Sequence, residues 1–431
     1  MPDRRGGSGA GFEMSSYYAI GARPLAAPRL SSDERADVVI IGAGYTGLWT
    51  ALECVRRGLS AVVLEARSVG FGASGRNGGQ AIPGWRKGVP DLIRTFGAER
   101  ARRLFALSEE ARRSVLSLIA EEGLECDLRQ GGHLLAAARR RDVEGLKREA
   151  EALASFIGYG EARFLTAEDV RERVASARSF GGLLDMGGFQ IHPLKFALGL
   201  ARAALRRGAR IYEESPVLEI EATSNGVRIR AEGGDVRADH AVVACDALPG
   251  GPAPWLASAV MPVAAYQIAT EPLAGADQLI RGGLAVSDTR FAVNYYRISA
   301  DNRLIFGGGE RYTVRPPATI EGFVRPFLEE VFPQARDLRI EHAWGGLVSI
   351  TRSRFPDVGR EGRLLHALGF SGQGVLLTAL AGRAMAEDLI GRPDMLREME
   401  GLSPSRFPGG EFLRSPLYSV GMLYHAARDR L

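Results

Sequence analysis

The chain has 431 residues, of which 45% are hydrophobic and 25% charged, a balance typical of a globular protein with two domains. It excludes collagen, long disorder and small disulfide-stabilised scaffolds. Lys and Arg together number 55 against 51 Asp and Glu, and the resulting formal net charge of +4 gives little reason to expect a nucleic-acid partner.

Cysteine and lysine are both scarce in this chain. The three cysteines are widely separated, which fits neither a disulfide framework nor a zinc site, so we expect a reducing cytoplasmic location. No apolar run approaches the roughly 20 residues of a bilayer span, and no basic leader with an apolar stretch opens the chain. Residues 1–13 indicate a flexible extension, with Met14 as an alternative start. Lysine occurs only at Lys87, Lys147 and Lys195.

The strongest local pattern lies near the front of the chain. Residues 37–44 are an apolar run ending in glycine, residues 46–58 follow a helical pattern, and residues 60–66 are a second apolar run. This order predicts strand, helix, strand.

Three glycines mark the turn between the first strand and the helix. Gly42 permits the tight turn, Gly44 lets the backbone approach a pyrophosphate, and Gly47 allows close packing of helix on strand. Glu65, at the end of the second strand, can accept hydrogen bonds from both ribose hydroxyls and would repel a 2′-phosphate. The motif predicts FAD or NAD, and the alternative is a glycine-rich turn without a ligand.

A run with five glycines follows at residues 70–80. Backbone with so few side chains can lie flat against a large planar ring, and Ser74, Arg76 and Asn77 add hydrogen-bond donors. The alternative is a flexible surface loop. Joined to the preceding motif, the run favours FAD over NAD.

Later segments predict a domain assembled from separated pieces. A helical stripe covers residues 98–122, and a helix over 193–207 precedes a strand at 209–212 and short alternating strands up to 245. Strand-like segments separated by Pro and Gly between residues 251 and 343 predict a mostly antiparallel sheet. Residues 364–391 again predict strand, glycine-rich turn and helix.

The glycine-rich turn at residues 369–375 is the third candidate binding element. It directly precedes an apolar helix, so free N–H groups and the positive end of the helix dipole would face an anion or an electron-rich oxygen. A plain tight turn is the alternative.

Together these motifs resemble the D-amino acid oxidase superfamily of FAD enzymes, and within it the γ-glutamylputrescine oxidase type. The likeness rests on the Gly42 to Glu65 unit, on GASGRNGGQ at 72–80, on QIHP at 190–193 and on GFSGQGV at 369–375. That type also tends to begin with an SYY segment, here residues 16–18, and to finish with FPGG, here 407–410. The resemblance spans roughly residues 15–430.

The resemblance implies an α/β fold, α+β overall, with a Rossmann-like FAD-binding domain of the glutathione-reductase type and an inserted, mostly antiparallel substrate domain. The expected FAD-binding domain is discontinuous, with residues 31–90, 180–250 and 340–391. The expected substrate domain has residues 91–179 and 251–339. Residues 1–30 are expected to be flexible or extended, and 392–431 to be a C-terminal extension.

The resemblance also implies which residues contact FAD. Val217 and Cys245 are equally good core residues of strands. The residues expected near the ADP half are Gly42, Gly44, Gly47, Glu65, Ala66, Arg67, Val217, Cys245 and Ala247. Those expected around the isoalloxazine are Ala73, Ser74, Arg76, Asn77, Gly78, Gly79, Gln80, Gly345, Gly346, Thr351, Gly369, Ser371, Gly372, Gln373, Gly374 and Val375.

Two departures from related enzymes change the expected chemistry. Sarcosine oxidases of this superfamily attach flavin to a cysteine in the segment matching residues 345–351, which contains no cysteine, so we expect non-covalent FAD. Those enzymes also carry an oxygen-activating lysine at the position matching Ile305, so an activating charge must come from elsewhere, with Arg297 as the obvious candidate.

Candidate substrate residues are Tyr295 and Arg297, on a strand where relatives present side chains over the flavin, and Trp344. Arg297 could clamp a substrate carboxylate or could lie on the surface. Trp344 could wall the pocket or fill the core. For His192, before Pro193, a capping or packing role is favoured over catalysis.

The expected activity is oxidation of a C–N bond in an amine or amino acid. Hydride transfer to flavin N5 would give an imine that water hydrolyses, with O2 as acceptor and H2O2 as product. One alternative is a dehydrogenase that passes electrons to a quinone or carrier, and a distant one is a binding or RNA-modification module. The substrate could be a γ-glutamylated polyamine, a secondary amino acid or an aminophosphonate.

Overall fold

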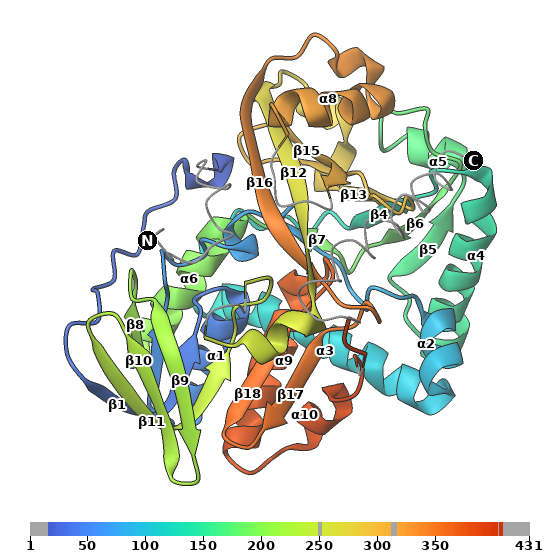
Figure 1. Cartoon of the computed structure of the whole chain (residues 1–431). Coiled ribbons are helices and arrows are strands. Elements are labelled where there is room, and N and C mark those ends of the chain that lie inside the picture. Colours follow the sequence, from blue (N-terminus) through green and yellow to red (C-terminus); the bar gives the residue numbers. More distant parts are fainter. Residues whose placement is uncertain (1–15, 249–251, 312–316, 404, 408–431) are drawn as a thin grey trace.

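Two eight-stranded sheets, each with its own helices, make up the body of the protein (Figure 1). The computed structural model describes residues 16–248, 252–311, 317–403 and 405–407. The expected extension at residues 1–13, residues 408–431 of the expected C-terminal extension and all but the first residue of the FPGG segment therefore lie outside the described residues.

The first sheet has a parallel centre. Its strand order is β17-β18-β11-β1-β2-β8, with a β9–β10 hairpin added through β10 to β11. The pairs β1–β11, β1–β2, β2–β8 and β11–β18 are parallel, and β1 and β2 supply the apolar, doubly buried strands that such a sheet requires. The strands are β1 (Glu34–Ile41), β2 (Ala61–Leu64), β8 (Arg210–Tyr212), β9 (Val217–Thr223), β10 (Gly226–Ala231), β11 (Gly234–Val243), β17 (Asp357–Glu361) and β18 (Leu364–Leu368).

One face of this sheet is covered by helices. Their apolar stripes form a core with the inward residues of β1, β2, β8 and β11. The helices are α1 (Tyr45–Arg56), α3 (Ala98–Glu121), α6 (Pro193–Arg206) and α9 (Gly374–Leu389).

The second sheet is mostly antiparallel, as the sequence predicts. Its order is β16-β12-β15-β14-β13-β4-β6-β5, and among these pairs only β4 with β13 is parallel. The helix α8 (Ile320–Val331) packs on one face of it. The strands are β4 (His133–Ala136), β5 (Ala162–Leu165), β6 (Gly182–Asp185), β12 (Met261–Pro272), β13 (Ala285–Asp288), β14 (Tyr295–Ile298), β15 (Arg303–Arg311) and β16 (Ile340–Ile350).

Smaller elements complete the described part of the chain. A two-stranded ladder joins β3 to β7, which are far apart in sequence. The elements are α2 (Val89–Phe96), α4 (Val143–Glu151), α5 (Ala167–Arg171), α7 (Ala276–Leu279), α10 (Asp394–Met399), β3 (Gln80–Ala81) and β7 (Phe189–Gln190).

The sheets divide the chain at other points than the boundaries expected from sequence. β6 and β16 were expected in the FAD-binding domain but pair within the second sheet. α3 was expected in the substrate domain but packs in the core of the first sheet's helices. The alternation of side chains along a strand is the same in either sheet. The local sequence pattern therefore does not show which strands it pairs with.

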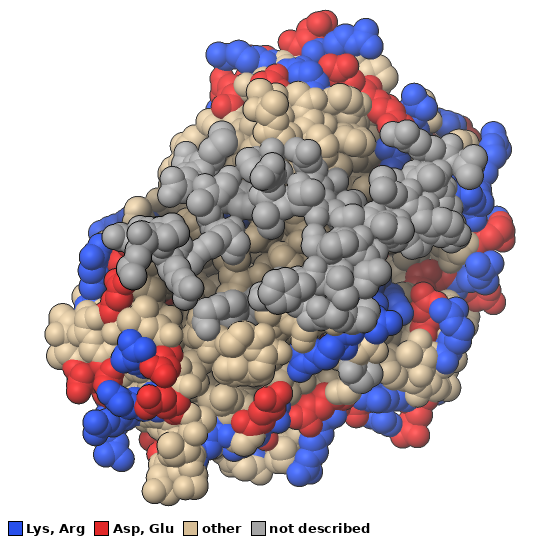
Figure 2. All heavy atoms as spheres, viewed as in Figure 1, with Lys and Arg blue, Asp and Glu red and all other residues tan. Residues whose placement is uncertain are grey.

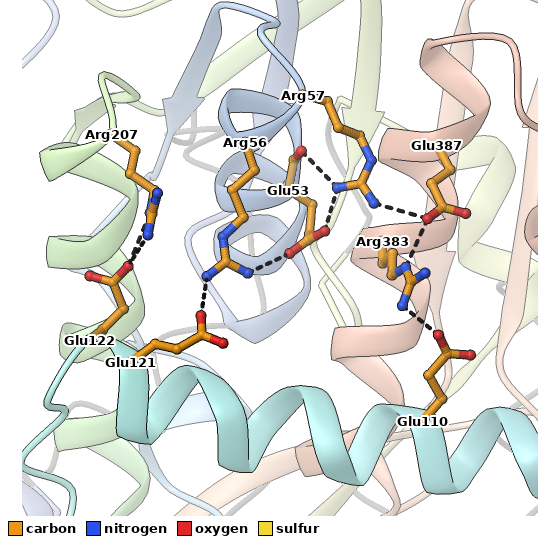
Figure 3. A network of polar contacts seen from close by, with 9 residues as sticks. All are labelled: Glu53, Arg56, Arg57, Glu110, Glu121, Glu122, Arg207, Arg383 and Glu387. Atoms are coloured by element: carbon orange, nitrogen blue, oxygen red, sulfur yellow. Dashed lines mark hydrogen bonds and ion pairs between the residues drawn. The ribbon is translucent and has the colours of Figure 1, made fainter.

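Ion pairs connect the ends of the helices that cover the first sheet (Figure 3). Arg57, the residue directly after α1, donates to Glu387 of α9 at 2.9 Å, and Arg383 of α9 donates to the same carboxylate at 2.8 Å. Arg56 of α1 donates to Glu121 of α3 at 3.2 Å. Arg57, Arg383 and Glu387 are partly buried, so their pairs fix α1 against α9 more firmly than surface pairs would. Glu121 is more than half exposed, so its pair with Arg56 contributes less to the position of α3.

The described surface mixes charges of both signs. On the face drawn in Figure 2, acidic and basic side chains alternate around the rim rather than gathering by sign. Among the described residues, no helix is long and apolar enough to cross a membrane.

Candidate active site

Four loops of the first sheet meet at one edge. Ile41 at the end of β1 pairs with Leu64 of β2 and with Val243 of β11, and Val243 pairs in turn with His366 of β18. All four strands are parallel, so their carboxyl ends coincide, which is where open α/β sheets bind ligands. The loops that follow carry residues predicted from the sequence, namely Gly42, Glu65, Cys245 and Gly369.

The turn from β1 to α1 depends on its glycines. A Cβ on Gly47 would lie 2.0 Å from the carbonyl oxygen of Gly42, so only glycine lets the helix approach this closely. Gly42 itself has a φ of 104°, and a Cβ there would lie 2.8 Å from the Ala244 carbonyl oxygen. At Gly44 a Cβ would contact only the Ser74 hydroxyl, at 3.0 Å. Gly44 and Gly47 therefore keep the backbone at the start of α1 free of Cβ atoms, as a pyrophosphate site requires, and Ser74 Oγ accepts the Tyr45 N–H there at 2.9 Å.

Glu65 fixes the shape of this turn. Its carboxylate accepts hydrogen bonds from the backbone N–H groups of Ala43, at 2.7 Å, and Arg67, at 2.9 Å. Burial raises the pKa of Glu65, while the two backbone donors act in the opposite direction. Ala66 lies in the loop that follows β2. Val217, the first residue of β9, is partly exposed.

The loops after β11 and β18 are connected by a carboxylate. Asp246, between Cys245 and Ala247, has a φ of 45° and accepts the Gly369 N–H at 2.9 Å. Burial raises the pKa of the Cys245 thiol to about 12, so the thiol stays protonated. Thr351 packs its methyl group where a Cβ on Gly369 would lie, at 2.3 Å.

The α9 helix begins without a side-chain cap. Gln373 is the N-cap residue and its side chain does not bond the first turn, while its amide reaches the Trp85 carbonyl at 3.4 Å. Ser371, at a φ of 52°, donates to the Gly369 carbonyl. The N–H groups of the first turn, from Gly374 and Val375 onward, have no partner within the helix. Gly372 has open space around its Cα.

The glycine-rich segment 70–80 is ordered by its own polar residues. Ala73 begins a short 3-10 turn, and the Asn77 amide donates to the Ala73 carbonyl at 3.0 Å and accepts the Gly79 N–H at 2.8 Å. Arg76 donates to the Phe71 carbonyl at 2.8 Å and to the Gly345 carbonyl at 3.2 Å. These hydrogen bonds make the segment an ordered element of the fold rather than a loose surface loop.

The second sheet presents one face to this segment. Side chains alternate along each strand, so Tyr296 and Phe306 pack with α8 while Tyr295, Arg297 and Ile305 point the other way. The strand register places two rows on this second face. One row is Arg297, Ile305, Ala269 and His342, and the other is Tyr295, Gly307, Gln267 and Trp344.

The second row contacts the backbone of residues 76–78. Trp344 is fully buried and donates from Nε1 to the Arg76 carbonyl at 3.0 Å, and Gln267 donates to the same oxygen at 2.6 Å. The ring of Tyr295 crosses Gly307 and Gly78, since a Cβ on either glycine would come within 3 Å of it. Gly346 lies beside the Arg76 side chain.

Arg297 is buried and makes four hydrogen bonds to other parts of the chain. Its acceptors are the Gly78 carbonyl at 2.6 Å, Gln190 Oε1 at 3.1 Å, and the Ile191 carbonyl and Tyr18 hydroxyl, both at 3.2 Å. It does not lie on the surface, the alternative considered from the sequence.

Two further residues were weighed from the sequence. His192 caps α6 by accepting the Lys195 N–H at 3.2 Å, which confirms the favoured capping role. Gln80 begins β3 and donates to carbonyls of Val286 and Tyr296 in the second sheet.

Sequence reasoning missed two participants. Tyr18 enters the site from the N-terminal segment, and only its place in the SYY motif singled it out. Gln267 lies in an apolar strand without any motif, so no sequence signal could have found it.

The residues present fit a planar dinucleotide cofactor. A glycine-lined turn leads into α1, α9 begins uncapped, and the buried Oε1 of Gln267, beside segment 76–78, has no hydrogen-bond partner. Across the described ranges no group of three or more His, Cys, Asp or Glu could hold a metal ion.

Comparison with known proteins agrees with this geometry. A family model described as FAD dependent oxidoreductase matches residues 37–388. The chain belongs to this family. It is 38% identical over 422 residues to gamma-glutamylputrescine oxidoreductase of Escherichia coli (strain K12), covering 97% of this chain and 98% of the relative. The enzyme class and the family expected from the sequence are confirmed.

Solved structures of the same fold include glycine oxidase from Geobacillus kaustophilus, with a TM-score of 0.69 and 21% identity over 83% of this chain and 95% of that one. L-proline dehydrogenase from P. horikoshii has a TM-score of 0.70 and 20% identity, over 82% of this chain and 93% of that one. These likenesses confirm the expected fold class: a parallel sheet joined to a mostly antiparallel one.

Proposed function

We propose that this FAD-dependent oxidoreductase oxidises a C–N bond of an amine or amino acid, with a γ-glutamylated polyamine as the first candidate substrate. The observation that carries the proposal is that segment 70–80, which bonds the start of α1 at the first sheet's carboxyl edge, also bonds the face of the second sheet that bears Gln267 and Trp344. The similarity to gamma-glutamylputrescine oxidoreductase over nearly the whole of both chains supports the substrate class.

The chain's residues would hold and orient the reactants. Glu65 would accept ribose hydroxyls, and the glycine-lined start of α1 would hold the pyrophosphate. Segment 73–80, Gly345 and the start of α9 would surround the isoalloxazine. FAD, when bound, supplies the hydride acceptor for a neutral amine substrate and passes the electrons on.

FAD is proposed to be held without a covalent bond. The segment 345–351 contains no cysteine, and the Cys245 thiol, with its pKa raised to about 12 by burial, is a poor nucleophile. Acid precipitation should therefore release all the flavin into the supernatant. Flavin that stays with the precipitate would contradict the proposal.

The test of the activity is a panel of amines and amino acids scored by anaerobic bleaching of the flavin. This readout does not depend on the electron acceptor. We expect bleaching by at least one γ-glutamylated amine and much slower bleaching by the free amine. Protein that purifies colourless and takes up no FAD would refute the proposal.

A dehydrogenase that uses a quinone or carrier is the second candidate. The observation in its favour is Ile305, which is 1% exposed and lies in one apolar cluster with Tyr17, Tyr18, Ala269 and Trp344. An oxygen-activating cation cannot act from that position, although Arg297 lies beside it in register. Reoxidation of the reduced protein in air decides: an oxidase reoxidises quickly and releases H2O2, and a dehydrogenase does not.

A further inference from the structure

The N-terminal tyrosine pair is buried between the second sheet and the helix α6. Tyr18 is fully buried, and its ring lies 5.3 Å from the ring of Trp344 and 5.0 Å from that of His192. Tyr17 lies beside it, with its ring centroid 5.5 Å from that of His342. A segment that precedes the first sheet in sequence thus covers the row of the second sheet that carries Ile305.

The two hydroxyl groups contact different partners. The Tyr18 hydroxyl accepts a hydrogen bond from Nη2 of Arg297 at 3.2 Å. The Tyr17 hydroxyl donates to Asp301, at the turn between β14 and β15. Of the two hydroxyl groups, only that of Tyr18 hydrogen-bonds to Arg297.

Arg297 in turn shapes the turn at residues 78–79. Its Nε donates to the Gly78 carbonyl, and a Cβ on Gly79 would lie 2.7 Å from its Nη2 and 2.2 Å from the Ile191 carbonyl oxygen. Gly79 has a φ of 70°, and its carbonyl accepts the Ile191 N–H at 2.8 Å. The turn is closely fitted around the guanidinium group, and β3 follows directly from it.

We propose that Tyr18 is a positioning residue of the flavin site, which acts through Arg297 to hold the 78–79 turn in its binding conformation before the cofactor arrives. The inference rests on the proposed function, since it assigns that turn to the isoalloxazine surface. Without the Tyr18 hydroxyl, Nη2 of Arg297 loses one of its two acceptors. The guanidinium group is then held only by carbonyl oxygens, those of Gly78, Ile191 and the Gln190 side chain. The turn must then be ordered at the moment of binding, and this cost appears as weaker affinity.

The test compares Tyr18→Phe with its neighbour Tyr17→Phe as the matched control. Each substitution removes one hydroxyl from one ring of the same segment. Apoprotein of each variant is titrated with FAD by quenching of flavin fluorescence, and its thermal midpoint is measured without FAD. We expect Tyr18→Phe to weaken FAD binding about 10-fold, the effect of one hydrogen bond to a charged group, while Tyr17→Phe stays within about 2-fold of wild type.

A double-mutant cycle with Arg297→Lys tests the route of the effect. Lysine keeps the charge but carries its three donors on a single atom, which cannot reach acceptors as far apart as those of Arg297, so it should weaken FAD binding at least as much as Tyr18→Phe does. Adding Tyr18→Phe to Arg297→Lys should then weaken FAD binding by less than about a further 2-fold, because both substitutions act through the Arg297 guanidinium group.

The outcomes separate the inference from the proposed function. Wild-type protein that binds no FAD overturns both. Wild-type protein that binds FAD, with Tyr18→Phe lowering the thermal midpoint but leaving FAD affinity unchanged, makes Tyr18 a packing residue and overturns the inference alone. Equal weakening by Tyr17→Phe, or strict additivity with Arg297→Lys, also overturns it.

Discussion

The glycines at the start of α1 allow a graded test of the cofactor site. In Gly47→Ala the new Cβ would lie 2.0 Å from the Gly42 carbonyl oxygen, and ordinary contact begins at 3.4 Å. The turn and the helix must therefore move apart by roughly 1.4 Å. Overpacking of this kind costs about 1–3 kcal/mol of stability, and it would carry the start of α1 away from the proposed pyrophosphate site.

We expect Gly47→Ala to weaken FAD binding about 100-fold, as the loss of one or two hydrogen bonds to a charged group would, and to lower the thermal midpoint of the apoprotein. Gly44→Ala should separate the two effects. Its Cβ would contact only the Ser74 hydroxyl, at 3.0 Å, and the φ of −81° suits alanine, so the fold should be kept while the approach to the cofactor is blocked.

The control is Gly160→Ala, where an added Cβ would have no neighbour within 4 Å. The FAD affinity and the thermal midpoint of this variant should both match those of wild type. The assay is fluorescence titration of apoprotein with FAD, alongside thermal unfolding without it. FAD binding by Gly47→Ala within about 3-fold of wild type would refute the assignment of this turn to the pyrophosphate, and a folded Gly44→Ala with unchanged affinity would refute the role of Gly44.

Three further predictions concern stability. Burial lowers the pKa of His133 from 6.5 to about 3, so the unfolded chain binds a proton that the folded chain refuses. From this group, stability present above pH 6.5 should fall by up to about 5 kcal/mol as the pH drops toward 3. Urea unfolding of His133→Gln should show a slope that is shallower by this amount, with the part due to His192, whose pKa burial lowers to about 4, still present. Glu53→Gln, in the network of Figure 3, should cost about 2 kcal/mol of stability because it leaves partly buried arginines underpaired. Glu219→Gln, in an exposed pair, should cost less than about 0.5 kcal/mol. Equal losses of stability in urea unfolding would contradict this expectation. Trp344→Phe removes the donor to the Arg76 carbonyl and also part of a fully buried ring, so it should cost at least about 1 kcal/mol in the same measurement. A change indistinguishable from zero would mean that neither the bond nor the lost packing contributes.

The parts of the site that the sequence predicts well are those set by short-range sterics. The turn at Gly42 to Gly47 and the turn at Gly369 each lie between a buried strand and a helix, and local pattern is enough to define both. Their meeting at one edge follows from parallel strands alone.

Contacts between distant segments could not be predicted in this way. The sequence of β16 fits an apolar strand with glycines in either sheet. Only its pairing with β12 shows that it belongs to the second sheet. Tyr18 gives no periodic signal, because a single turn of 3-10 helix has none. Arg297 was weighed as a substrate clamp or a surface residue, and the pattern of its strand contained no hint of three acceptors from residues 78 to 191.

The near absence of lysine has a structural consequence at these junctions. Arg297 donates from Nε, Nη1 and Nη2 to acceptors that lie in different directions, and Arg76 joins the Phe71 and Gly345 carbonyls in the same manner. A guanidinium group offers five N–H donors in a fixed plane, so one buried side chain can join several chain segments. An ammonium group places its three donors on a single atom and is more strongly hydrated, so a lysine at either position would leave buried carbonyls unpaired. Where the two sheets meet, arginine is thus required by geometry as well as by charge.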